Sequence, residues 1–233
     1  MALGQIKQLF EWNWAEAEAE YTRGIALNPR STHAILVYGN YLMTVGRFEE
    51  SADIARQAVD LDPLSAYAIF QVGWALNHMG RNAEALEEYN KALELAPDDA
   101  NSHLEMAQFY GEGGKVNQAS RYAERAEALL GKGASPAWLG RLGSAYGIAN
   151  READARRILN VLMTRAEKEY VPPTCPACIC ASLGEVEMAL DLLEQAYEKR
   201  DVIMVWLKVR HHFDPLRAQP RFQELLRRMN FPN

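Results

Sequence analysis

Two consecutive stretches of equal length determine the predicted architecture. Residues 32–65 read THAILVYGNYLMTVGRFEESADIARQAVDLDPLS, and residues 66–99 read AYAIFQVGWALNHMGRNAEALEEYNKALELAPDD. A glycine precedes the second half of each stretch and a proline lies near its end: Gly46 and Pro63, then Gly80 and Pro97. Apolar and small residues between these marks recur at i, i+3, i+4 and i+7, which is the spacing of one helix face. Each stretch is therefore predicted as a helix, a glycine turn, a second helix and a proline-marked turn.

The spacing of 34 residues between Pro63 and Pro97 resembles the tetratricopeptide repeat. That repeat has large, small and proline positions in a fixed order. In residues 66–99 the matching positions are Ile69, Val72, Gly73, Leu76, Ala85, Tyr89, Ala92 and Pro97. The small residues of the motif let paired helices approach closely, the large ones fill the gap, and the proline ends the second helix.

The resemblance extends over nearly the whole chain and implies an all-α fold. It predicts a right-handed solenoid of about six helix pairs with a C-terminal capping helix, in one domain over residues 1–233. The expected units are 1–31 (partial), 32–65, 66–99, 100–133, 136–169 and 170–200 (degenerate), followed by the cap at 201–233. The run from Asp201 to Val209 has the composition of a strand. A short packed helix is preferred, since an all-helical fold offers no strand partner.

The end of the chain carries a second resemblance. Leu183-Gly184, Trp206-Leu207-Lys208 and the segment from His212 to Met229 resemble the closing part of tetratricopeptide arrays in large bacterial signalling proteins. Such arrays commonly follow a DNA-binding domain, a nucleotide cyclase or a protein kinase. The resemblance implies a protein-binding or sensory module without catalytic residues. The alternative is a regulatory segment of a larger transcription factor, cyclase or kinase, and the short first helix favours further chain upstream of Met1.

Composition narrows the classes of partner. The chain has 48% apolar residues and a net charge of −6, from 31 acidic against 25 basic side chains. The apolar fraction suits a globular protein with a core, and the acidic balance argues against binding through nucleic-acid phosphates. No apolar run reaches the ~18 residues that a membrane-spanning helix needs. We therefore expect a cytoplasmic protein with a protein or peptide ligand, while the sequence predicts no particular oligomeric state.

The three cysteines form a C-x-x-C-x-C cluster of Cys175, Cys178 and Cys180. A C-x-x-C pair at a helix start can act as a redox pair or supply two of four zinc ligands, which makes a thiol or metal-binding protein the second alternative. A second ligand pair is missing unless His211 and His212 fold back. Cys180 occupies a large-residue position and is expected to pack as a small apolar side chain. We expect no metal, no cofactor and no enzymatic activity, because phosphate loops, nucleophile elbows and zinc-protease motifs are missing from the sequence.

The first helix of each pair is expected to line a concave groove, as the family resemblance implies. Read by register, its inward positions give the predicted binding residues Asn40, Tyr67, Phe70, Gln71, Trp74, Asn77, Gln108 and Arg141. Aromatic rings can bury area against an extended peptide while amides bond its backbone. Phe70 and Trp74 are expected at the centre of this surface. The alternative is that Tyr67, Phe70 and Trp74 pack against the neighbouring repeat.

Overall fold

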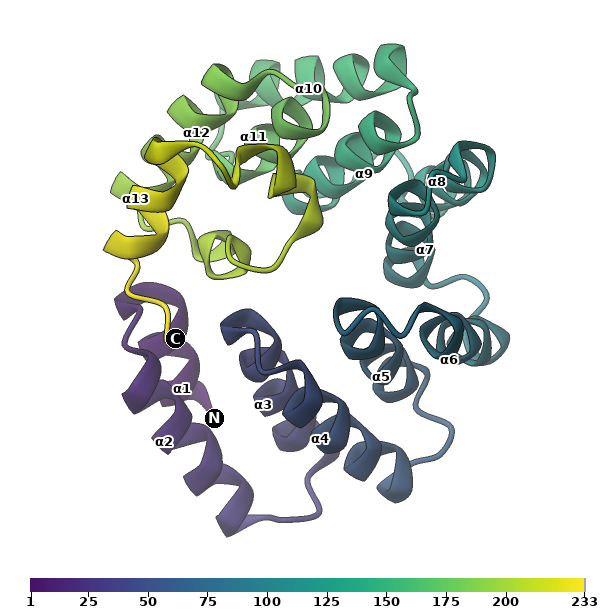
Figure 1. Ribbon diagram of the computed structural model, residues 1–233, viewed down its shortest axis with the longest axis vertical. Coiled ribbons are helices and arrows are strands. Elements are labelled where there is room, and N and C mark those ends of the chain that lie inside the picture. Colours follow the sequence, from purple (N-terminus) through teal and green to yellow (C-terminus); the bar gives the residue numbers. More distant parts are fainter. Residues whose placement is uncertain (233) are drawn as a thin grey trace. The chain divides into compact units, whose positions relative to one another are not determined.

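A computed structural model describes residues 1–232, and every regular element in this range is a helix (Figure 1). The all-α prediction is therefore confirmed. The elements before Asp98 are α1 (Ala2–Ile6), the π-helical turn η1 (Lys7–Glu11), α2 (Trp14–Leu27), α3 (Thr32–Val45), α4 (Phe48–Leu61), α5 (Ala66–His78) and α6 (Asn82–Leu95). Those after it are α7 (Ala100–Glu112), α8 (Val116–Leu130), α9 (Pro136–Ile148), α10 (Glu152–Ala166), α11 (Thr174–Ser182), α12 (Val186–Glu198), the 3₁₀ helices η2 (Val202–Trp206) and η3 (His211–Leu216), and α13 (Pro220–Arg228).

The helices group into two compact units. Unit 1 comprises residues 1–98 together with the terminal residues from Met229 onward, and unit 2 comprises residues 99–228. Within each unit the helices pack in consecutive pairs, α3 with α4 and α5 with α6 in unit 1, and α7 with α8, α9 with α10 and α11 with α12 in unit 2. The division into two units does not test the predicted single domain over residues 1–233, which stays a prediction.

Short polar side chains begin three helices of unit 1, α2, α3 and α5. Asn13, Ser31 and Ser65 each accept a hydrogen bond from a backbone N–H three residues later, at 3.2 to 3.3 Å. These bonds satisfy donors that have no partner inside the helix. Between paired helices, Gly46 and Gly80 lie in the left-handed region with φ of 87° and 74°. Glycine adopts this conformation without steric cost, so the predicted glycine turns are present.

The close packing of α5 on α6 depends on Gly73. A Cβ atom at residue 73 would come within 3.0 Å of the ring of Tyr89 and within 3.1 Å of the carbonyl oxygen of Ala85. Tyr89 itself is buried, so its ring cannot swing away into solvent. Any larger side chain at this position would push the two helices apart.

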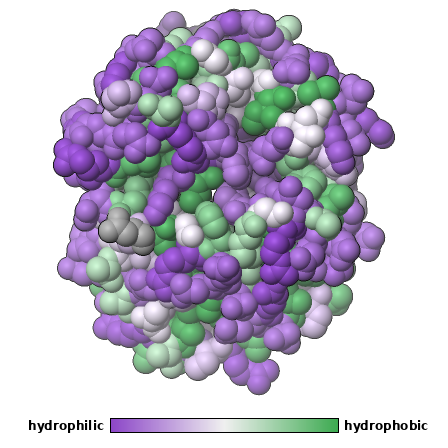
Figure 2. All heavy atoms as spheres, viewed as in Figure 1, coloured by the Kyte–Doolittle hydropathy of each residue, from purple (hydrophilic) through white to green (hydrophobic). Residues whose placement is uncertain are grey.

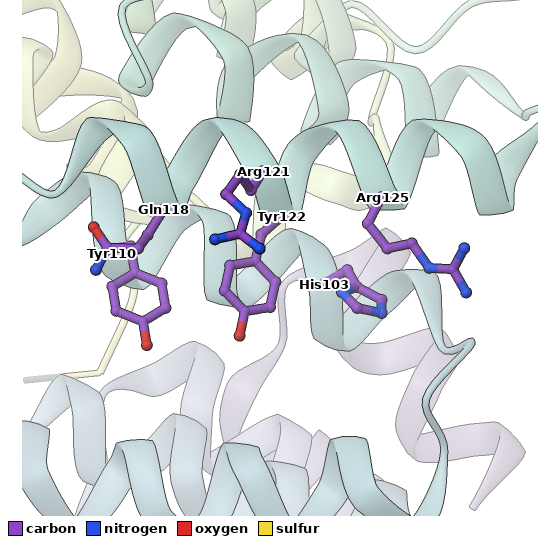
Figure 3. A pocket seen from close by; sticks show the side chains of 6 residues that line it. All are labelled: His103, Tyr110, Gln118, Arg121, Tyr122 and Arg125. Atoms are coloured by element: carbon purple, nitrogen blue, oxygen red, sulfur yellow. The ribbon is translucent and has the colours of Figure 1, made fainter.

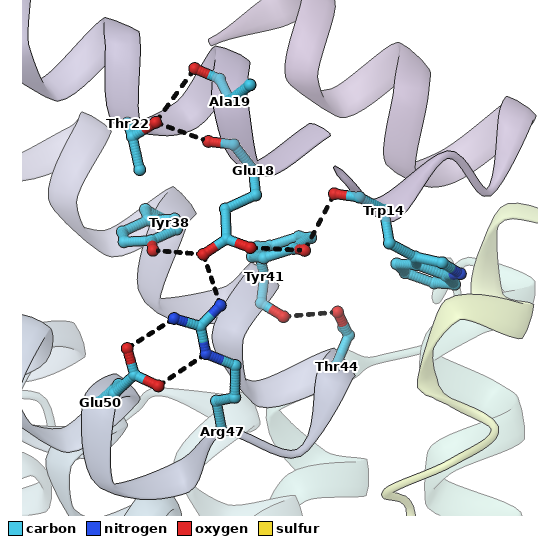
Figure 4. Close-up of polar contacts among 9 residues, drawn as sticks. All are labelled: Trp14, Glu18, Ala19, Thr22, Tyr38, Tyr41, Thr44, Arg47 and Glu50. Atoms are coloured by element: carbon cyan, nitrogen blue, oxygen red, sulfur yellow. Dashed lines mark hydrogen bonds and ion pairs between the residues drawn. The ribbon is translucent and has the colours of Figure 1, made fainter. Parts of the chain in front are cut away.

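A polar network joins α2, α3 and the start of α4 (Figure 4). The guanidinium of Arg47 pairs with Glu18 of α2 and, at 2.6 Å, with Glu50 of α4. The hydroxyl of Tyr38 donates to Glu18 at 3.0 Å, and that of Tyr41 lies 3.5 Å from the same carboxylate. The half-buried carboxylate of Glu18 therefore connects α2 with α3 and with the residue that begins α4.

The terminal residues pack on the beginning of the chain within unit 1. The indole N–H of Trp14 donates to the carbonyl oxygen of Met229 at 2.9 Å. The ring of Phe231 stacks on Trp14 with centroids 4.6 Å apart and an interplanar angle of 22°. Aromatic stacking and a buried hydrogen bond thus hold residues 229–232 against α2.

Unit 2 ends in three short elements after α12. The carboxylate of Asp201 accepts one hydrogen bond from the N–H of Thr174 in α11 and another from the N–H of Ile203 in η2, both at 3.0 Å. Residues 202–206 form the 3₁₀ helix η2, so the preference for a short helix over a strand is confirmed. The final helix α13 packs on α12, where Arg221 pairs with Glu187, Asp191 and Glu194 at 2.6 to 2.9 Å.

The surface is mainly polar on the face that Figure 2 shows, where hydrophobic residues form smaller groups among hydrophilic ones. The most exposed large apolar side chains, Leu27 and Leu64, lie at the end of α2 and in the turn after α4. Single exposed apolar residues are normal in globular proteins. Within the described chain, no helix combines the length and the apolar character that crossing a membrane requires.

Candidate functional site

Three of the predicted binding residues form one hydrogen-bonded group in unit 1, which we call the amide–tyrosine cluster: Asn40, Tyr67 and Gln71. Asn40 projects from α3, and Tyr67 and Gln71 project from α5, one turn apart. The side-chain amide of Asn40 donates to the Tyr67 hydroxyl at 2.9 Å, and that of Gln71 donates to it at 3.2 Å. Gln71 also donates to the Asn40 carbonyl oxygen at 2.7 Å. The structure therefore brings these three residues together in one hydrogen-bonded cluster.

The cluster has a buried base and an exposed tip. Gln71 is buried, and its amide nitrogen also lies 3.3 Å from the backbone carbonyl of Leu36, so its two hydrogens are shared among three acceptors. Gly39 leaves room for it, because a Cβ at residue 39 would lie only 3.2 Å from Gln71 Oε1. Tyr67 retains 46% of its accessible surface. The ring of Tyr67 is thus exposed, while two side-chain amides hold its hydroxyl by hydrogen bonds.

The hydroxyl of Tyr67 has a hydrogen-bond donor that is not used. It accepts both amide hydrogen bonds, and it donates to no acceptor within residues 1–232. A tyrosine hydroxyl carries one donor and two acceptor positions. The remaining O–H of Tyr67 can therefore donate to a carbonyl oxygen supplied by a ligand.

Phe70 and Trp74 occupy a different environment from Tyr67. They retain only 3% and 5% of their accessible surface. The ring of Phe70 lies 5.5 Å from that of Tyr89, and Trp74 makes an edge contact with His78 at 5.6 Å. Their burial favours the packing alternative over the expected role at the centre of a binding surface, and that role stays a prediction.

The remaining amides, Asn77 and Gln108, are half-buried in α5 and α7. Neither makes a side-chain hydrogen bond within the described residues. They lie in different units, and their contribution to a peptide-binding surface stays a prediction.

Arg141 belongs to a charged cluster in unit 2. Its guanidinium pairs with Glu105 of α7 at 2.5 Å and donates to Asn101 at 2.7 Å. Arg210 pairs with the same Glu105 oxygen. Glu105 is 5% exposed, so its charge is largely removed from water and compensated by the two guanidinium groups.

Burial changes the protonation behaviour of this cluster. Removal from water lowers the pKa of Arg141 to about 10, so the guanidinium still carries its charge at neutral pH. Burial, followed by the positive charge of Arg210, lowers the pKa of His212 to about 3. His212 is therefore neutral at neutral pH. The pairing of Arg141 and Arg210 with Glu105 was not predicted from the sequence, because no spacing rule connects positions so far apart.

The cysteines lie in α11, and all three are buried. Burial raises the pKa of Cys178 and of Cys180 to about 12 and raises the pKa of Cys175 further. The thiol of Cys178 donates to the carbonyl oxygen of Thr174 at 2.9 Å. Thiols with such pKa values are poor nucleophiles, and no group of three His, Cys, Asp or Glu side chains in residues 1–232 is arranged to hold a metal ion. These findings favour packing over the thiol or metal alternative.

Comparison with known proteins agrees with the helix-pair architecture. Residues 36–100 match the family model of the tetratricopeptide repeat. The fold is of the tetratricopeptide type. The crystal structure of PilW, a type IV pilus biogenesis factor, is 18% identical with a TM-score of 0.58, over 92% of this chain and 95% of that chain.

Two further solved structures share these tetratricopeptide-type helix pairs. A chain of the APC/C hetero-tetramer Cut9–Hcn1 is 16% identical with a TM-score of 0.61, over 97% of this chain and 48% of that chain. The crystal structure of MamA is 20% identical with a TM-score of 0.50, over 72% of this chain and 96% of that chain. Likeness at these identities concerns the fold alone. The comparison with curated proteins gives no match.

Proposed function

We propose that this protein is a non-catalytic interaction module that binds an extended peptide segment of a partner protein at the amide–tyrosine cluster. The observation that carries the proposal is the state of Tyr67. Its ring is 46% exposed, yet its hydroxyl is fixed by Asn40 and Gln71. An exposed aromatic ring held in one orientation is a preorganised anchor.

Preorganisation matters because binding costs conformational entropy. An ordinary exposed side chain must be immobilised when a ligand arrives, at about 0.5 to 1.5 kcal/mol for each rotamer-rich side chain. The two hydrogen bonds to Tyr67 reduce this cost before the ligand binds. Tyrosine also combines a large apolar ring with a polar tip, which is why it is common among residues that dominate interface affinity.

The hydrogen-bonding capacity of the cluster suits a peptide backbone. The free O–H of Tyr67 can donate to a peptide carbonyl, and the ring can cover an adjacent side chain. Backbone bonding of this kind gives affinity with little dependence on peptide sequence. An extended segment is therefore a better fit than a compact small molecule.

The class of partner and the compartment follow from other observations. The net charge of −6 favours a protein ligand over nucleic acid. Three free cysteines suit a reducing compartment, and we place the protein in the cytoplasm. A regulatory role within a larger bacterial signalling protein stays a hypothesis from the sequence.

The test is a selection of random peptides displayed on phage against the full chain, followed by affinity measurements on the selected peptides. We expect Tyr67→Ala to weaken binding roughly thirtyfold, since a central aromatic anchor contributes about 2 kcal/mol. Tyr170→Ala is the matched control, because Tyr170 is also exposed, at 62%, and makes no side-chain hydrogen bond in the described chain. If the selected peptides bind Tyr67→Ala as tightly as they bind Tyr170→Ala, the proposal is refuted.

A further inference from the structure

Unit 2 contains a pocket between α7 and α8 that lies apart from the residues discussed above (Figure 3). Its volume is about 340 Å³. The side chains that line it are His103, Tyr110, Gln118, Arg121, Tyr122 and Arg125. The pocket shares no residue with the amide–tyrosine cluster, which lies in unit 1.

Aromatic rings form one wall of this pocket. The rings of Tyr110 and Tyr122 stack with centroids 5.5 Å apart and an interplanar angle of 18°. The imidazole of His103 lies 5.7 Å from Tyr122 on its other side. In Figure 3 the hydroxyl groups of both tyrosines point in the same direction. The wall is therefore apolar along the rings and carries hydrogen-bond donors at its edge.

Every lining side chain can donate a hydrogen bond, and none carries a carboxylate. Four of them make no side-chain hydrogen bond or ion pair within residues 1–232: Tyr110, Gln118, Arg121 and Tyr122. Burial raises the pKa of Tyr122, so its hydroxyl keeps its proton at neutral pH. The pocket thus gathers several donors that the described chain does not use.

Arg121, inside α8, differs in this respect from the arginines that immediately precede α4, α6 and α10. Arg47, Arg81 and Arg151 each pair with an acidic residue three positions later, at 2.6 to 2.7 Å. The residue three positions after Arg121 is Glu124, which pairs with Arg151 at 2.6 Å instead.

Glu127, the second acidic residue of α8, also forms its contacts outside the pocket. It pairs with Arg157 at 2.8 Å and accepts a hydrogen bond from the hydroxyl of Tyr146 at 2.5 Å. Helix α8 therefore directs its acids toward α9 and α10 and leaves Arg121 at the pocket without a carboxylate.

We infer that this pocket binds the carboxylate side chain of an acidic peptide segment. The guanidinium of Arg121 and the hydroxyls of Tyr110 and Tyr122 supply charge-assisted hydrogen bonds, which are the strong ones in proteins. The stacked rings cover the methylene groups that carry the carboxylate. A carboxylate satisfies the unused donors, whereas a cation would be repelled by the positive charge of Arg121.

The experiment measures binding of a fluorescent polyglutamate peptide to the full chain by anisotropy, at constant ionic strength. A polyglutamine peptide of equal length is the neutral probe. We expect the polyglutamate peptide to bind and the polyglutamine peptide not to bind. Arg121→Gln is expected to weaken binding about tenfold, as loss of a hydrogen bond between charged groups does. Tyr122→Phe keeps the ring stack, removes one donor and is expected to weaken binding severalfold.

Arg30→Gln is the matched control for charge. Arg30 is exposed and forms no ion pair in the described chain, but it lies outside the pocket. Equal losses for Arg121→Gln and Arg30→Gln would show attraction by charge alone and overturn the assignment. Equal binding of both peptides would overturn it too, as would a calorimetric titration in which inorganic phosphate binds while the polyglutamate peptide does not. Because the two sites share no residue, peptides selected through Tyr67 would still bind Arg121→Gln.

Discussion

Glu105 and Arg210 are 105 positions apart in the sequence, and their side chains form an ion pair inside unit 2. Arg141 pairs with the same carboxylate from α9. One buried acid thus connects the first helix pair of unit 2 with the segment after its last pair. The consequence for stability can be measured directly.

We expect Glu105→Ala to destabilise the protein by about 3 to 5 kcal/mol. The substitution leaves two guanidinium groups in a water-poor environment without their anion, and an uncompensated buried charge is costly. Urea unfolding followed by circular dichroism measures the change. Glu187→Ala is the matched control, because Glu187 also pairs with an arginine but is 80% exposed, and we expect only a small change there. Similar losses in both variants would contradict the prediction.

His212 is expected to make the stability of the protein depend on pH. Its pKa is about 3 in the folded chain and about 6.5 in an unfolded one, so the unfolded state binds more protons between these values. The contribution of His212 is therefore fully present above pH 6.5 and is lost as the pH falls toward 3. Between pH 7 and pH 5 the unchanged protein should lose about 2 kcal/mol more than His212→Gln. Parallel stability curves for the two proteins would show that His212 is not held neutral.

Trp74 and Tyr67 should respond differently to truncation. We expect Trp74→Ala to lower the free energy of unfolding by about 3 to 5 kcal/mol, because a buried aromatic side chain leaves a cavity. Tyr67→Ala removes an exposed ring and should change stability far less. Thermal unfolding of both variants tests the contrast. A melting temperature of Trp74→Ala that matches the unchanged protein would return Trp74 to the list of candidate anchors.

The helix pairs could be predicted because their signals are local. Gly46 and Gly80 lie at positive φ, and η2 begins at the Val202 that the sequence analysis assigned to a short helix. Helical spacing, glycine turns and proline stops all act over a few residues, so one sequence suffices to place them. The π-helical turn Lys7–Glu11 has no such signal and was not predicted.

The site could be predicted only in part. Register identifies which residues share a helix face, and it brought Asn40, Tyr67 and Gln71 into one list. It cannot tell how much of that face neighbouring side chains cover, which is why Phe70 and Tyr67 were predicted together although only Tyr67 is exposed. Pairs such as Glu105 with Arg210 follow from the tertiary arrangement, and no local pattern encodes them.

The contact between Trp14 and Phe231 bears on the order in which the chain is completed during synthesis. Unit 2 is continuous in sequence, whereas unit 1 consists of residues 1–98 and the terminal residues from Met229 onward. Chains emerge from the ribosome with the N-terminal part first, and domains tend to fold as they appear. More than two hundred further residues are therefore synthesised after Trp14 before Met229, the hydrogen-bond acceptor of its indole, is added to the chain. The unit whose synthesis starts first is the last to acquire all of its contacts.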